Sequence, residues 1–162
     1  VGSEMCIRDR LGLVPYGDIV PMTAECPTLT FNTIGRHQSR LVRTRVASNL
    51  SPWLAKTEVG DMHTIAISHG EGRFVASDDV LAQLKANGQI ATQYVDEAGV
   101  PGMDLEVNPN GSLLAIEGIT SPDGRVFGKM GHSERYSNGT FKNVPGEKDQ
   151  PLFTAGVEYF TA

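Results

Sequence analysis

The stretch LLAIEGITSPDGRVFGKMGHSER, residues 113–135, decides how the C-terminal part of the chain folds. Its turn sequence SPDG, at 121–124, is flanked on both sides by apolar segments, which predicts a β-hairpin. The second strand of this hairpin leads directly to His132 and Glu134. Because side chains two positions apart on an extended segment point to the same side, we expect the imidazole and the carboxylate to lie together.

The preceding part of the chain is predicted to contain more strands than helices. Apolar and polar residues alternate over 42–46, as in a half-buried strand, and 62–68 and 89–95 also have strand-like composition. One clear helix is predicted to begin after Ser77, whose hydroxyl can cap it, and to end before Gly88. We therefore expect antiparallel strand pairs in the sheet.

The composition is typical of one globular domain. The chain has 162 residues, of which 40% are hydrophobic and 20% charged. Its net charge of -5 argues against binding to nucleic acid, and no apolar run approaches the roughly 20 residues that cross a bilayer, so we expect neither nucleic acid nor a membrane as a partner. The two cysteines, Cys6 and Cys26, and the lack of a signal-like segment favour reduced thiols and a cytoplasmic localisation.

Metal and phosphate chemistry have no recognisable motif in this sequence. The four histidines are scattered, and neither CxxC nor HExxH occurs. A Walker-type phosphate loop is also missing. We expect no metal site and no resident cofactor.

His132 and Glu134 have the residue types of a general base and the carboxylate that orients it. In acyl transfer from an amide, a histidine moves the proton of the nucleophile, and a carboxylate fixes the histidine tautomer. An ordinary surface ion pair would have the same spacing. The residues alone leave both interpretations open.

The run His-Gly-Glu-Gly-Arg at 69–73 is a second candidate site. Its two glycines allow the backbone to approach a ligand closely. The side chains of His69, Glu71 and Arg73 would then bind a polar substrate such as an amino acid. A tight turn with solvated charges fits the same residues equally well.

Three ordered motifs give the chain a specific resemblance. His-Gly-Glu-Gly-Arg at 69–73, Asn-Pro-Asn-Gly-Ser at 108–112 and His-Ser-Glu-Arg at 132–135 occur in this order. Together with segments 30–45 and 51–54, they resemble the C-terminal class I glutamine amidotransferase domain of phosphoribosylformylglycinamidine synthase. The resemblance extends from Leu11 to about Phe160 and is more specific than any one motif.

The resemblance implies a fold and a role for the motif residues. The family has an α/β fold with a three-layer, open mixed sheet of the flavodoxin-like type, which would be incomplete at the N-terminus of this chain. By motif match, His132 would be the general base and acid, and Glu134 would orient it. His69, Glu71 and Arg73 would lie near the glutamine pocket. Gly131 and Ser133 stand where the family often has prolines, in a Pro-His-Pro-Glu pattern.

The function implied by the resemblance is the glutaminase half-reaction of a C–N ligase. L-glutamine would be hydrolysed through a cysteine thioester, and the ammonia would pass to a synthetase domain of the same parent chain. That domain would use ATP and Mg²⁺ to convert formylglycinamide ribonucleotide to the amidine in de novo purine biosynthesis. The fragment itself would hold no cofactor.

The family's nucleophile is missing from the expected place. It lies in a Gly-x-Cys-x-Gly elbow, about nine residues before the position of Leu11. Here that place holds VGSEMCIRDR, residues 1–10, in which Cys6 has no flanking glycines. We expect 1–10 to be a non-native segment that resembles translated adapter sequence, and 11–162 to be the C-terminal part of the amidotransferase domain. Without the nucleophile, the fragment alone is expected to be inactive.

Two other functions fit the same residues. A non-catalytic module would bind glutamine or a neighbouring domain and do no chemistry. An unrelated thiol hydrolase would use Cys26 as its nucleophile with His132 as its base. Cys26 precedes a proline and lacks the glycines of a nucleophile elbow, so we expect it to be a buried structural thiol.

Overall fold

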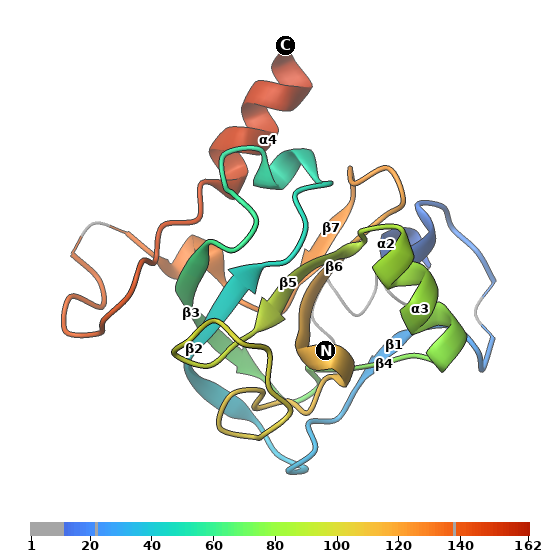
Figure 1. Ribbon diagram of the computed structural model, residues 1–162, viewed down its shortest axis with the longest axis horizontal. Coiled ribbons are helices and arrows are strands. Elements are labelled where there is room, and N and C mark those ends of the chain that lie inside the picture. Colours follow the sequence, from blue (N-terminus) through green and yellow to red (C-terminus); the bar gives the residue numbers. More distant parts are fainter. Residues whose placement is uncertain (1–11, 22, 138) are drawn as a thin grey trace.

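The computed structural model describes residues 12–21, 23–137 and 139–162 (Figure 1). The segment 1–10, which we expect to be non-native, lies outside the described residues, and so does Cys6. All helices and strands named below therefore belong to the described part of the chain.

A five-stranded sheet of order β3-β2-β5-β6-β7 forms the centre of the molecule. Every neighbouring pair in it is antiparallel, in agreement with the strand-rich sequence. A separate two-stranded antiparallel sheet joins β1 to β4. The strands are β1 Thr28–Thr30, β2 Gln38–Val46, β3 Met62–His69, β4 Arg73–Val75, β5 Ile90–Tyr94, β6 Ile116–Thr120 and β7 Phe127–Lys129.

Helical segments pack on both faces of the five-stranded sheet, and α4 projects beyond the end of the sheet (Figure 1). They are α2 Leu13–Tyr16, α3 Asp78–Ala86 and α4 Leu152–Thr161, with short 3-10 turns η1 Pro52–Leu54, η2 Leu113–Ala115 and η3 Ser133–Arg135. Ile90 packs in one core cluster with residues of α2 and α3, whereas the adjacent Ala91 packs in another with η1 and α4. Because successive strand residues point to opposite faces, these two clusters place a helical layer on each side of β5.

Helix α3 forms where the sequence predicts it. The Ser77 hydroxyl accepts a hydrogen bond from the backbone N–H of Val80 at 3.4 Å, and the helix ends at Ala86, with Asn87 as its C-cap before Gly88. Leu81 and Leu84 are buried against the sheet. Both the predicted cap and the predicted end are confirmed.

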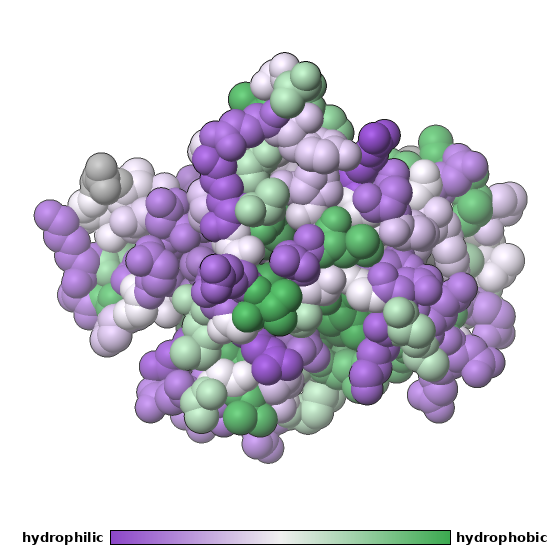
Figure 2. All heavy atoms as spheres, turned by 45° about the horizontal axis from the view of Figure 1, so that its top comes forward, coloured by the Kyte–Doolittle hydropathy of each residue, from purple (hydrophilic) through white to green (hydrophobic). Residues whose placement is uncertain are grey.

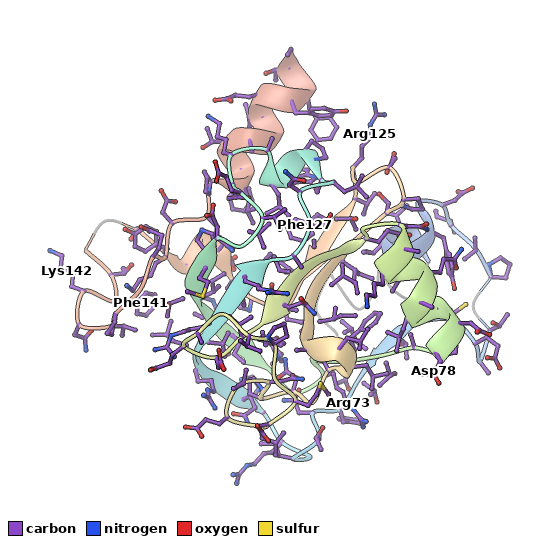
Figure 3. All side chains as sticks on the ribbon, viewed as in Figure 1. Arg73, Asp78, Arg125, Phe127, Phe141 and Lys142 are labelled. Atoms are coloured by element: carbon purple, nitrogen blue, oxygen red, sulfur yellow. The ribbon has the colours of Figure 1, made fainter. Side chains whose placement is uncertain are left out.

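The hairpin of β6 and β7 is also confirmed, with a shorter first strand than predicted. Thr120 pairs with Phe127 across the turn. Leu114 and Ala115 have positive φ angles of 52° and 53°, so the apolar segment before Ile116 forms the turn η2 instead of extending the strand. Figure 3 shows Phe127 beside the sheet, and its side chain packs against the cluster of η1 and α4.

The surface alternates between polar and apolar areas (Figure 2). The largest apolar contribution from a helix comes from α4, which exposes Phe153, Val157 and Phe160. Within the residues that the structure describes, no helix has the length and apolar character needed to cross a bilayer.

Candidate active site

His132 and Glu134 lie beside the end of the hairpin and face each other. Nδ1 of His132 is 2.6 Å from Oε1 of Glu134. The backbone N–H of His132 donates to the carbonyl of Ala66 on β3 at 2.8 Å, so the histidine is anchored to the neighbouring strand. The two side chains are 30% and 55% exposed, which leaves the pair at the surface and within reach of a substrate. The predicted placement is observed, and the catalytic role stays a prediction.

The geometry of this pair favours one tautomer of His132. With Glu134 ionised, the proton lies on Nδ1 and Nε2 is left with a free lone pair. Partial burial acts to raise the pKa of Glu134. This pKa is lowered by hydrogen bonds from the backbone N–H of Glu134 itself and from His132, and also by the positive charges of His132 and Arg135. Together these effects outweigh burial and leave the pKa of Glu134 below its ordinary value. The carboxylate therefore stays ionised at neutral pH and can stabilise a protonated imidazole.

His69 lies at the end of β3, three residues after Ala66, and its ring is largely enclosed by protein. Its Nε2 is 2.9 Å from Oδ1 of Asn110, and a Cβ atom on Gly72 would overlap the ring. Burial is the main cause that lowers the pKa of His69, so the neutral form is favoured. The His69 side chain thus packs inside the 69–73 loop and stabilises its conformation.

Glu71 and Arg73 are the other two members of the second predicted site. Both are half-buried. Arg73 begins β4, where it pairs with Thr30 of β1, and Figure 3 shows it at the end of the molecule far from α4. Its Nε is buried and has no hydrogen-bond partner among the described residues. Whether Glu71 and Arg73 contact a substrate stays a prediction.

The Asn-Pro-Asn-Gly-Ser loop at 108–112 holds the 69–73 loop in place. Asn110 is fully buried and donates from Nδ2 to the Tyr94 hydroxyl at 2.7 Å. The Ser112 hydroxyl donates to the carbonyl of Gly72 and accepts from the N–H of Phe74, both at 3.1 Å. These contacts bring two of the three sequence motifs together, and β3 connects them to the third.

Asn32 adds a third segment to this assembly. Its side chain donates to the carbonyl of His69 at 2.9 Å and accepts from the N–H of Gly72 at 3.0 Å. Asn32 is buried, and its amide also donates to the carbonyl of Arg36 at 2.9 Å, so it joins its own turn to the 69–73 loop. Segments that are distant in the sequence therefore meet at one end of β3.

Cys26 does not lie in this assembly. Its thiol is partly exposed, which corrects the expectation of a buried thiol. Hydrogen bonds from the backbone N–H and side chain of Thr23 are the leading causes that lower its pKa. Its described polar contacts are with Thr23 and with Tyr16 of α2, and none joins it to His132.

Sequence reasoning missed two charged residues behind the His132–Glu134 pair, Glu117 on β6 and Lys129 on β7. Glu117 is fully buried, and its Oε1 is 3.6 Å from Nζ of Lys129. The available signal was the occurrence of a charge within each apolar strand of the predicted hairpin. The strand register, which brings the two together, could not be deduced from that signal.

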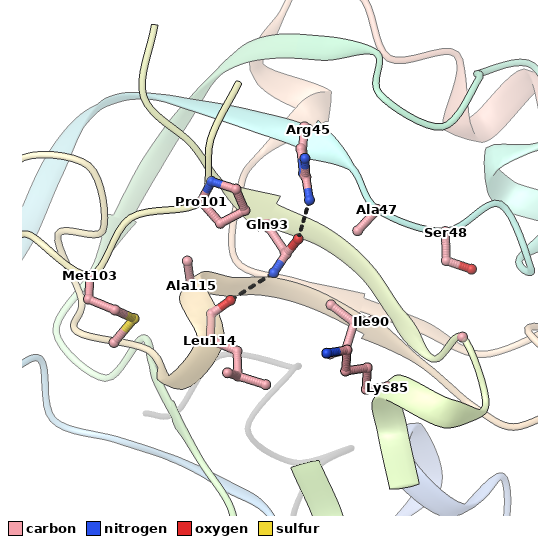
Figure 4. A pocket seen from close by; sticks show the side chains of 11 residues that line it. Arg45, Ala47, Ser48, Lys85, Ile90, Gln93, Pro101, Met103, Leu114 and Ala115 are labelled. Carbon is pink, nitrogen blue, oxygen red and sulfur yellow. Dashed lines mark hydrogen bonds between the residues drawn. The ribbon is translucent and has the colours of Figure 1, made fainter. Parts of the chain in front are cut away.

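The described residues contain clefts that are separate from this site. One of about 440 Å³ lies against β2, β5 and η2, where Gln93 accepts from Arg45 and donates to the carbonyl of Leu114 (Figure 4). None of the predicted site residues lines it. The described part of the chain also has no group of three or more metal-ligating side chains.

Comparison with known proteins gives a consistent family. The model of the CobB/CobQ-like glutamine amidotransferase domain matches residues 6–160. The PurQ subunit of phosphoribosylformylglycinamidine synthase from Aquifex aeolicus is 37% identical over 131 residues, which cover 81% of this chain and 52% of that protein. The PurQ subunit from Methanosarcina barkeri is 35% identical over 133 residues, covering 82% and 55%.

A solved structure extends this similarity to the fold. The structure of PurLQS from Thermotoga maritima matches with a TM-score of 0.60 and 28% identity, over 82% of this chain and 52% of that chain. The match supports the predicted α/β fold class of the glutamine amidotransferase type. The chain spans about half the length of the curated relatives it matches.

Proposed function

The chain belongs to the CobB/CobQ-like glutamine amidotransferase domain family, and on this premise we propose that it supplies part of the glutaminase site of phosphoribosylformylglycinamidine synthase. The observation that carries the proposal is the 2.6 Å contact between His132 and Glu134, in a motif that follows β7. The relatives that match the chain bear the name of this synthase. Glutamine is accordingly the proposed substrate.

His132 moves protons in the proposed reaction. Its Nε2 takes the proton of a cysteine thiol, and the sulfur attacks the side-chain amide carbon of glutamine. The C–N bond then breaks, and the imidazolium gives its proton to the departing nitrogen, which leaves as ammonia. Glu134 stabilises the imidazolium while it carries the charge.

Water completes the cycle through the same histidine. Nε2 takes a proton from water as its oxygen attacks the thioester carbon, and the C–S bond breaks to release glutamate. The sulfur then regains a proton from the imidazolium. The mechanism requires a cysteine opposite Nε2, and Cys26, with its contacts to Thr23, does not supply one.

The ammonium and carboxylate groups of the glutamine substrate are proposed to lie toward the 69–73 loop. Strand β3 joins Ala66, which anchors His132, to this loop. Glu71 and Arg73 carry the charges that would pair with an ammonium and a carboxylate. His69 supports the loop from inside, through Asn110.

The ammonia would be used by a synthetase part of the assembled enzyme. The similar Thermotoga maritima structure is of PurLQS, which makes association with a synthetase the natural extension of the proposal. That part would hold ATP and Mg²⁺ and activate the acceptor amide. The assembled enzyme would then be a ligase that uses glutamine as its nitrogen donor.

The proposal is tested by comparing two nitrogen donors in the assembled synthase that carries the nucleophilic cysteine. We expect His132→Ala to lower the glutamine-dependent rate by at least about a thousandfold, because the proton carrier is lost, and to leave the ammonia-dependent rate unchanged. His37→Ala is the matched control, since His37 is another exposed histidine with a single described hydrogen bond, to Ser68. An unchanged glutamine-dependent rate in His132→Ala would favour a non-catalytic binding or docking module.

A further inference from the structure

A buried ion pair lies directly behind His132. Glu117 has a fully buried side chain, and that of Lys129 is only 11% exposed. Burying one charge costs several kcal/mol, so such groups are retained only with close polar partners. Here Oε1 of Glu117 is 3.6 Å from Nζ of Lys129, and Oε2 accepts a hydrogen bond from the Thr92 hydroxyl at 2.5 Å.

Glu117 contacts the residue before the histidine. Its Oε1 accepts the backbone N–H of Gly131 at 2.5 Å. A Cβ atom at position 131 would lie 2.9 Å from this oxygen and 2.9 Å from a methyl group of Ile65. Glycine is therefore the residue that allows the carboxylate to reach the backbone here.

Lys129 contacts the residue after the histidine. Its Nζ donates to the Ser133 hydroxyl at 3.1 Å and to Oε1 of Gln150 at 2.9 Å. The Ser133 hydroxyl in turn donates to the same Gln150 oxygen at 2.6 Å. The lysine thus connects the start of η3 to the segment that precedes α4.

We propose that the Glu117–Lys129 pair is a positioning device that fixes the backbone on both sides of His132. Glu117 holds Gly131, Lys129 holds Ser133, and the N–H of His132 itself is held by Ala66. Three anchors on three consecutive residues leave the histidine little freedom to turn away from Glu134. The catalytic meaning of this device rests on the function proposed above.

The device explains why glycine and serine stand on either side of His132. Proline has no N–H to donate to Glu117, and it has no hydroxyl to accept from Lys129. Proline restricts the backbone through its own ring, whereas Gly131 and Ser133 are restricted here by hydrogen bonds to buried charges. Four residues therefore act together in this device: Glu117 on β6, Lys129 on β7, Gly131 and Ser133.

The double variant Glu117→Gln/Lys129→Met separates positioning from stability. It removes both charges together and nearly preserves side-chain volume, so the free energy of unfolding is expected to stay close to that of the wild type. In the ¹⁵N spectrum of the histidine-labelled chain, the ratio of Nδ1–H to Nε2–H tautomer at His132 should fall about tenfold, the effect of losing about one hydrogen bond.

Leu81→Ala is the matched control for this measurement. It removes buried apolar contacts of α3 and lowers stability without touching the ion pair. We expect its His132 tautomer ratio to equal that of the wild type. An unchanged ratio in the double variant, or an equal loss of the ratio in Leu81→Ala, would overturn the proposal.

A kinetic readout keeps this inference distinct from the proposed function. In the assembled synthase, the double variant should lower kcat of the glutamine-dependent reaction about tenfold, with KM for glutamine and the ammonia-dependent rate unchanged. A changed tautomer ratio with an unchanged kcat would show that the pair positions His132 and that His132 is not the glutaminase base. An unchanged tautomer ratio contradicts positioning, whatever the activity of His132→Ala.

Discussion

At the scale of single residues, the site depends on polar groups that have specific hydrogen-bond and charge partners. His132 faces Glu134 at 2.6 Å, and the backbone beneath it is held by Glu117 and Lys129. None of these contacts is strong alone in water. Burial of Glu117 and Lys129 makes their contacts costly to lose, because each charge would then be left without compensation.

Removing one member of the ion pair should therefore be worse than removing both. We expect Lys129→Met to lower the free energy of unfolding by about 3 kcal/mol, because the carboxylate of Glu117 stays buried without its cation. The double variant Glu117→Gln/Lys129→Met should regain most of this loss. Urea unfolding followed by circular dichroism measures both, and a double variant less stable than Lys129→Met would contradict the interpretation.

At the scale of elements, the hairpin of β6 and β7 is tied to η1 through its turn. Gly124 has φ of 73°, and its carbonyl accepts the Ser51 hydroxyl at 2.7 Å. A Cβ atom there would lie 2.6 Å from the carbonyl oxygen of Leu50. The turn therefore depends on the close packing of Gly124 against Leu50 as well as on the positive φ of Gly124.

Gly124→Ala should cost about 3 kcal/mol of unfolding free energy, since strain of the left-handed backbone adds to displacement of Leu50. Gly35→Ala is the matched control, because Gly35 has a similar φ of 68° with no atom within 4 Å of an added Cβ. We expect about 1 kcal/mol for the control, from strain alone. Equal losses in the two variants would show that the contact with Leu50 is unimportant.

The elements with local signals could be predicted from the sequence. Ser77 and Gly88 delimit α3, and the SPDG turn gives the hairpin, because capping and turn chemistry act between near neighbours. The strand order β3-β2-β5-β6-β7 and the pairing of β1 with β4 depend on distant segments, which leave no local pattern.

The candidate site likewise has one contact that the sequence predicts and others that depend on distant segments. The His132–Glu134 contact follows from a spacing of two residues, so the sequence predicted it. The approach of Glu117 to Lys129 depends on the strand register, which pairs Gly118 with Lys129 and which no local pattern in the sequence indicates. The hydrogen bond of the His69 ring likewise depends on a distant residue, Asn110, which is 41 residues away in the sequence.

At the scale of the whole molecule, buried histidines make stability depend on pH. His63 is 5% exposed, and burial is the main cause that lowers its pKa, as it is for His69. With the folded pKa below the unfolded value of about 6.5, the unfolded chain binds more protons between the two. This stability is fully present above the unfolded pKa and is lost as pH falls toward the folded pKa.

Lowering the pH from about 7.5 to about 5.5 should therefore reduce the free energy of unfolding, by at most about 1.4 kcal/mol per pH unit for each histidine. The carboxylates with lowered pKa, such as Glu134 and Glu147, add their losses at lower pH. Urea titrations at several pH values measure the slope. His63→Gln should reduce it, and an unchanged slope in that variant would exclude His63 as a source.

The isolated 162-residue chain should not hydrolyse glutamine. Cys26 is hydrogen-bonded to Thr23 and does not contact His132, so the described residues offer no thiol for the proposed covalent step. Glutamate release by the purified chain, followed with a coupled dehydrogenase assay, should equal the background rate. A rate above background that falls in His132→Ala would show that the chain contains its own nucleophile.

The central claim is that Glu134 holds His132 with Nε2 free to accept a proton. The most direct measurement is the ¹⁵N–¹H spectrum of the histidine-labelled chain at neutral pH, compared with that of Glu134→Ala. We expect a His132 proton on Nδ1, shifted downfield by its short hydrogen bond, and loss of that signal in the variant. A proton on Nε2 in the wild type, unaffected by Glu134→Ala, would contradict the assignment of His132 as the oriented base.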